Sequence, residues 1–167
     1  MSSSQPIGIF DSGFGGLTVA RAIIDLLPSE DIVYFGDTSR YPYGPQPLKK
    51  VKSYSDQISN YLIDEHDVKM IVIACNTASA AAEDNLRAST EVPIVGVIHP
   101  GAQAVAEVSV TKRIGVIGTV GTINSQAYDN AIKEISQKNI KLVSVACPGF
   151  VEFVERGEFD GEQVRIL

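Results

Sequence analysis

The chain has 167 residues, 44% of them hydrophobic, which is enough to bury the core of one domain or of two small ones. Its formal net charge is -6 and its Lys and Arg residues form no cluster, which argues against nucleic-acid binding, because such binding needs positive charge opposite the phosphates. No apolar run approaches the roughly 20 residues needed to cross a bilayer, and the amino-terminal residues lack the pattern of a signal peptide, so we expect a cytoplasmic protein with no membrane partner.

Short β-branched runs alternate along the chain with longer segments of helical spacing. Strands are expected at residues 6–10, 31–37, 68–75, 92–98, 113–119 and 140–147, and helices at residues 17–27, 48–65, 80–89, 101–109 and 125–136. Strands that are apolar on both faces and separated by helices are typical of parallel sheets covered on each side. The pattern predicts an α/β fold of mostly parallel sheets flanked by helices.

A change in loop chemistry after Ile98 indicates where the chain divides. The segment "HPGAQAV" at residues 99–105 begins a new series of helices and strands. We therefore expect a first α/β domain at residues 1–98 and part of a second at residues 99–167.

The strand exits hold both cysteines and most of the glycines. In parallel α/β sheets, ligands bind at the carboxyl ends of the strands, in the loops that lead to the helices. These exits lie at residues 11–16, 36–44, 75–79, 99–103, 118–125 and 147–150. We expect the functional site among them.

Cys75 follows a buried strand and precedes an alanine-rich helix in the segment "IVIACNTASAAAE". The positive end of the helix dipole favours thiolate over thiol at this place, which makes Cys75 a candidate reactive residue. Asn76 and Thr77 add an amide, a hydroxyl and unpaired backbone donors that can hold a carboxylate. The alternative is that Cys75 is a small buried hydrophobe and that Asn76 or Thr77 only caps the helix.

Asp11 and Ser12 end the first strand and are followed by three glycines that let the backbone approach a ligand. The segment "DSGFGGLT" is neither GxGxxG nor a P-loop, so it indicates a nucleotide site only weakly. If the first and third strands are neighbours, Asp11 lies beside Cys75 and can exchange protons with it or orient an ammonium group. The alternative is that Asp11 caps its own helix.

Two further exits offer neutral polar groups. The segment "RYPYG" at residues 40–44 is a rigid loop in which Tyr43 and Gly44 can form a wall of a small polar site, although tyrosines packed on the domain are the simpler explanation. Thr119 and Thr122 can bind a carboxylate through their hydroxyls and the amides of a helix start, or only cap that helix.

The remaining candidates carry less chemistry. Cys75 and Cys147 lie far apart without metal-type spacing, so we expect reduced thiols and neither a zinc site nor a disulfide. Cys147 is followed by Pro148, which removes an anion-binding amide, so we expect Cys147 to pack rather than react. His99 is given no chemical role.

The chain resembles the glutamate racemases in five segments that occur in family order: "IGIFDSGFGGLTV", "YFGDTSRYPYG", "ACNTASA", "VIHPGAQA" and "IGVIGTVGTINSQAY". The resemblance implies two similar α/β domains and a cofactor-independent enzyme that interconverts L- and D-glutamate and supplies D-glutamate for peptidoglycan. One thiol removes the α-proton from one face of glutamate and a second thiol returns a proton to the other. The resemblance implies glutamate as the partner, no cofactor and no metal, and it leaves a homodimer open.

The resemblance also implies roles for single residues. Cys75 is expected to be the first catalytic thiol, assisted by Asp11. The carboxylates and ammonium of the substrate are expected to be held by Asp11, Ser12, Tyr43, Gly44, Asn76, Thr77 and Thr122.

One part of the family pattern does not occur in the chain. The family carries its second catalytic cysteine in a Gly-Cys-Thr-His segment, which these 167 residues lack, and Cys147 lies in a separate Cys-Pro segment. We therefore expect a fragment of a longer racemase, with the second domain truncated and with little racemisation by the chain alone.

Two other functions stay open. A racemase of aspartate or another small amino acid uses the same two-thiol chemistry, and a non-catalytic amino-acid-binding module keeps the pocket without turnover. A nucleotide-binding domain is not favoured, because no phosphate-binding lysine follows the first strand.

Overall fold

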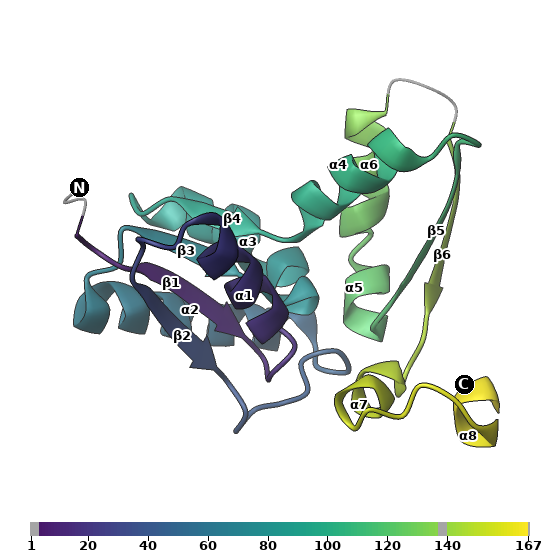
Figure 1. Cartoon of the computed structure of the whole chain (residues 1–167), viewed down its shortest axis with the longest axis horizontal. Coiled ribbons are helices and arrows are strands. Elements are labelled where there is room, and N and C mark those ends of the chain that lie inside the picture. Colours follow the sequence, from purple (N-terminus) through teal and green to yellow (C-terminus); the bar gives the residue numbers. More distant parts are fainter. Residues whose placement is uncertain (1–3, 137–139, 167) are drawn as a thin grey trace.

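Strands and helices alternate through the described part of the chain, which comprises residues 4–136 and 140–166 of a computed structural model (Figure 1). The strands are β1 (Ile7–Asp11), β2 (Ile32–Gly36), β3 (Met70–Ile73), β4 (Ile94–Gly96), β5 (Arg113–Gly118) and β6 (Lys141–Ala146). The helices are α1 (Leu17–Leu26), α2 (Leu48–His66), α3 (Asn76–Ser89), α4 (Ile98–Val108), α5 (Val120–Asn124), α6 (Ala127–Ile135), α7 (Phe150–Glu155) and α8 (Glu162–Ile166). The predicted α/β fold of parallel sheets flanked by helices is confirmed.

Four parallel strands form the first sheet, in the order β2-β1-β3-β4. Successive residues of β1 point to opposite faces. Ile9 packs with Ala20 of α1 in one cluster, whereas Phe10 packs with Leu62 of α2 and Ala82 of α3 in another. All residues of β1 are buried because helices cover both faces of the sheet, which explains its continuous apolar run.

β5 and β6 form a second sheet, also parallel, with α4 and α6 packed against it (Figure 1). Ile114 of β5 is buried together with Ala102 of α4 and Ile132 of α6. On the opposite face of the sheet, Ile117 and Val143 are 67% and 54% exposed. The alternation of burial along β6 follows from this packing on one face.

The chain passes from the first sheet to the second at Val97, between β4 and α4. The expected border between residues 98 and 99 falls one residue inside α4. The division into domains 1–98 and 99–167 stays a prediction.

Some elements differ from the sequence prediction. Residues 99–103 belong to α4 rather than to a loop, and Pro100 fits there because the first amides of a helix have no partner within it. Helix α3 begins at Asn76, earlier than expected, because Cys75 occupies the capping position. Helices α5 and α7 have five and six residues, which is too short for a helical period to be read from sequence.

No helix in the described residues combines the length and apolar character needed to span a bilayer. Helix α2 reaches 19 residues, but its buried side chains lie on one face only.

Leu62 tests the packing of α2 on the first sheet. Its side chain is fully buried, with Cδ1 close enough to Gly8 to lie 3.2 Å from a Cβ placed there. Replacing Leu62 with Ala leaves a cavity, so we expect the free energy of unfolding to fall by about 2–5 kcal/mol in urea denaturation. The matched change at Leu26, which is 76% exposed, should cost less than about 0.5 kcal/mol. Equal losses would contradict this core.

Candidate active site

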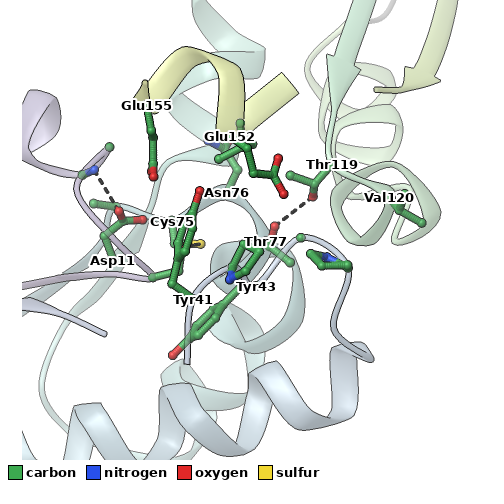
Figure 2. Close-up of a pocket in the computed structure, with 18 of the residues that line it drawn as sticks. Asp11, Tyr41, Tyr43, Cys75, Asn76, Thr77, Thr119, Val120, Glu152 and Glu155 are labelled. Atoms are coloured by element: carbon green, nitrogen blue, oxygen red, sulfur yellow. Dashed lines mark hydrogen bonds between the residues drawn. The ribbon is translucent and has the colours of Figure 1, made fainter. Parts of the chain in front are cut away.

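A cavity of about 410 Å³ opens where β1 and β3 end (Figure 2). β1 and β3 are paired neighbours, which is the condition under which Asp11 was expected to lie beside Cys75. Thr122, also expected in the site, is buried, and its hydroxyl contacts that of Thr77, which lines the cavity. The other predicted site residues all line the cavity: Asp11, Ser12, Tyr43, Gly44, Cys75, Asn76 and Thr77.

Cys75 is the N-cap of α3 and is only 6% exposed. The amide of Ala78 donates to its Sγ at 3.4 Å, and Sγ lies 3.6 Å from Oγ of Ser12. Burial, followed by the negative charge of Asp11, raises the pKa of the thiol to about 11, against the lowering effect of the donors from Ala78 and Ser12. The expected preference for thiolate at the helix start is therefore wrong for the unliganded site, because desolvation outweighs the helix-start donors.

Asp11 holds its own loop as well as lining the cavity. Its Oδ2 accepts from the amides of Gly13 at 3.1 Å and Gly16 at 3.0 Å. Gly16 sits so close that a Cβ there would lie 2.5 Å from Cβ of Asp11, which explains the glycine. In the described residues Oδ1 has no hydrogen-bond partner, so one carboxylate oxygen remains for a ligand.

The loop after β2 is anchored by Asp37, which is 3% exposed and was not singled out in the sequence. Tyr43 donates its hydroxyl to Asp37, and Nε of Arg40 lies 2.6 Å from the same carboxylate. Burial and then the hydrogen bond to Asp37 raise the pKa of Tyr43. Tyr43 therefore lines the cavity, but its hydroxyl is bonded to Asp37 rather than left for a ligand. Within the described chain the amides of Tyr43 and Gly44 have no partner and are the groups left for a ligand.

Three threonine hydroxyls gather at one end of the cavity. Oγ1 of Thr77 lies 3.0 Å from that of Thr119 and 3.2 Å from that of Thr122, and the last two are 3.0 Å apart. Thr119 caps α5, as one of the two interpretations expected, and it also lines the cavity. Gly44 lies against this cluster, since a Cβ there would be 2.7 Å from Cβ of Thr119. These hydroxyl protons can turn toward an anion.

Helix α7 adds two acids that the sequence analysis missed. Glu152 and Glu155 both line the cavity (Figure 2). Burial, followed by the carboxylate of Glu155, raises the pKa of Tyr41, which lines the same cavity. The spacing of three residues between the two acids puts them on one face of α7, a helix too short for the sequence pattern to reveal. Cys147 also lines the cavity and is partly buried, and the expectation that it packs rather than reacts stays a prediction.

The titratable groups of the cavity do not form a metal site. Among the described residues, no three His, Cys, Asp or Glu side chains gather in a way that could hold a metal ion.

Comparison with known proteins shows which family the chain matches. Residues 8–166 match the family described as Asp/Glu/Hydantoin racemase. The chain belongs to this family. Its relatives include the glutamate racemases of Shouchella clausii and Corynebacterium glutamicum, which are 51% and 52% identical to it over 98% and 97% of the chain.

Solved structures of family members have the same fold. A glutamate racemase isoform from Bacillus anthracis superposes with a TM-score of 0.88 at 45% identity over 92% of this chain. The glutamate racemase from Francisella tularensis in complex with D-glutamate gives 0.88 at 40% identity over 98%. The chain spans 57% and 60% of these two structures and 59% and 58% of the two relatives in length.

The thiol of Cys75 should ionise at about pH 11 in the unliganded protein. Alkylation by iodoacetamide should be slow near neutrality and should rise with pH, because only the thiolate reacts. Asp11→Asn should move the midpoint down, since it removes the negative charge that disfavours the thiolate. Mass spectrometry of the Cys75 peptide gives the rates, with Cys147 as the internal reference. A midpoint at or below about 8.5 would contradict the desolvated thiol.

Tyr43→Phe should destabilise the loop after β2. The change leaves the buried carboxylate of Asp37 without its phenol donor, so the free energy of unfolding should fall by about 1–3 kcal/mol. Tyr61→Phe is the matched control, because Tyr61 is 44% exposed on α2. Urea denaturation compares the two, and equal stabilities would argue against Asp37 as the anchor.

Proposed function

We propose that the chain binds glutamate in this cavity and removes its α-proton with Cys75, as part of a cofactor-independent glutamate racemase. The observation that carries the proposal is the buried thiol of Cys75 at the start of α3, beside Asp11, in a cavity walled by neutral hydrogen-bond donors. The names of the relatives and structural neighbours support glutamate as the substrate.

The polar groups of the cavity match the charges of glutamate. Glutamate has one ammonium and two carboxylates. The ammonium goes to Asp11 and the acids of α7, because these are the negative groups of the wall. The carboxylates go to neutral donors: the hydroxyls of Ser12, Thr77, Thr119 and Thr122, the side chain of Asn76, and the amides of Tyr43 and Gly44.

The proton step starts from a protonated thiol. A bound ammonium brings positive charge beside Cys75 and Asp11, which lowers the thiol pKa from its value in the unliganded site. The thiol proton passes to the carboxylate of Asp11, and the thiolate takes the α-proton as the C–H bond breaks and an S–H bond forms. The electron pair left on the α-carbon is delocalised into the adjacent carboxylate, which the neutral donors stabilise.

A proton returned to the opposite face gives the other enantiomer. The resemblance assigns that step to a thiol in a Gly-Cys-Thr-His segment, which does not occur in the 167 residues. We therefore propose that this chain exchanges the α-proton of one enantiomer. The racemase as a whole supplies D-glutamate for peptidoglycan in the cytoplasm, with the amino acid rather than a nucleic acid or a membrane as its partner.

The test is α-proton exchange of L- and D-glutamate in heavy water, followed by NMR. We expect exchange of one enantiomer by the wild-type chain and no exchange by Cys75→Ser. Cys147→Ser is the matched control, because Cys147 is a free thiol in the same cavity, and it should leave exchange unchanged.

Other outcomes separate the alternatives. Binding without exchange by a folded protein would identify an amino-acid-binding module. Faster exchange of aspartate would identify a racemase for the shorter substrate. Exchange of both enantiomers would mean that the chain holds a second base.

A further inference from the structure

Tyr128 of α6 reaches across to the residue that follows Cys75. Its hydroxyl donates a hydrogen bond to Oδ1 of Asn76 at 2.7 Å. Asn76 begins α3 beside the first sheet, whereas α6 packs on the second sheet, so the contact joins two residues that are 52 positions apart. We propose that Tyr128 is a positioning residue that orients the side-chain amide of Asn76 toward a substrate carboxylate. The inference rests on the proposed function.

The chemistry of an amide makes its orientation matter. Oδ1 of Asn76 is an acceptor and carries partial negative charge, whereas Nδ2 is a donor. A carboxylate is attracted to Nδ2 and repelled by Oδ1. Because Tyr128 offers a hydroxyl proton to Oδ1, it directs Nδ2 away from itself. In the described part of the chain Nδ2 has no partner, and Asn76 lines the cavity (Figure 2).

The ring of Tyr128 is held firmly enough to fix its hydroxyl. It packs against the buried cluster formed by α4, α6 and β5. A Cβ on Gly101 of α4 would lie 3.2 Å from the hydroxyl and 3.3 Å from Cε1 of the ring. A larger side chain at that position would push the ring away. The place of Tyr128 therefore explains the glycine in the "HPGAQ" segment.

A purely structural contact between α3 and α6 predicts different behaviour from a positioning role. Asn76 is exposed and its amide can rotate freely without the hydroxyl, so loss of the hydroxyl weakens ligand binding more than it weakens the fold. If Tyr128 acts through Asn76, loss of the Tyr128 hydroxyl has no effect on ligand affinity in a variant that already lacks the Asn76 amide. A double-mutant cycle measures this coupling directly.

The experiment measures D- and L-glutamate affinity by NMR titration for the wild type, Tyr128→Phe, Asn76→Ala and the double variant. Tyr128→Phe should weaken binding about fivefold, the loss expected for one neutral hydrogen bond. The double variant should bind no more weakly than Asn76→Ala. Tyr61→Phe, on the exposed face of α2, is the control and should bind like the wild type. Unchanged affinity in Tyr128→Phe, or effects that simply add, would overturn the proposal.

The side-chain NH₂ signals of Asn76 give a second readout that needs no ligand. In the free protein these signals should shift in Tyr128→Phe and stay unchanged in Tyr61→Phe. Unchanged signals in Tyr128→Phe would overturn the proposed contact. If the wild type binds neither enantiomer, the proposed function is wrong and the role of Tyr128 toward substrate falls with it, while these signals still decide whether the hydroxyl orients the amide.

Discussion

The parallel pairing of β1 with β3 is the constraint on which the site depends. Phe10 pairs with Ile73, and the amide of Ala74 donates to the carbonyl of Phe10 at 2.8 Å, so both strands end at the same edge. Asp11 and Cys75 follow at once. A slip of one residue would turn either side chain to the opposite face of the sheet, because successive residues alternate. The helices that bury the sheet also keep water from Cys75, which is why its thiol resists ionisation.

The charged side chains around the cavity are acidic. Among the described residues that line it there is no Lys, Arg or His, and the charged ones are Asp11, Glu152 and Glu155. In the proposed site, hydroxyls and amides bind the anionic groups of the ligand, and helix starts and loops set the directions of these donors. Such donors are effective only where water is excluded. The proposed site offers its carboxylates to a cationic group, so the anionic and cationic groups of a zwitterion have separate positions on the wall.

Contacts around the cavity also connect the elements of the two sheets. Thr77 of α3 contacts Thr122 of α5 and Thr119, which caps that helix. The amide of Gly121 donates to the carbonyl of Gly44 at 3.0 Å, and Asn76 accepts from Tyr128. Asp11 and Cys75, by contrast, belong to exits of a single sheet. A change in the placement of one sheet against the other therefore alters the groups proposed to bind carboxylates more than the pair proposed to move the proton.

The sequence by itself determined the alternation of strands and helices and the neighbourhood of the site. Apolar runs with turn residues between them depend on local chemistry, and the ends of parallel strands are where ligands bind, so Asp11, Ser12, Cys75, Asn76 and Thr77 could be selected without coordinates. Only the tertiary structure decided the ionisation of Cys75, because burial depends on residues distant in sequence. It also decided that the Tyr43 hydroxyl serves Asp37, that α7 brings two acids to the cavity, and that Tyr128 meets Asn76. The approach of α7 and of Tyr128 to the cavity is set by packing between segments distant in sequence, which leaves no periodic mark in the sequence.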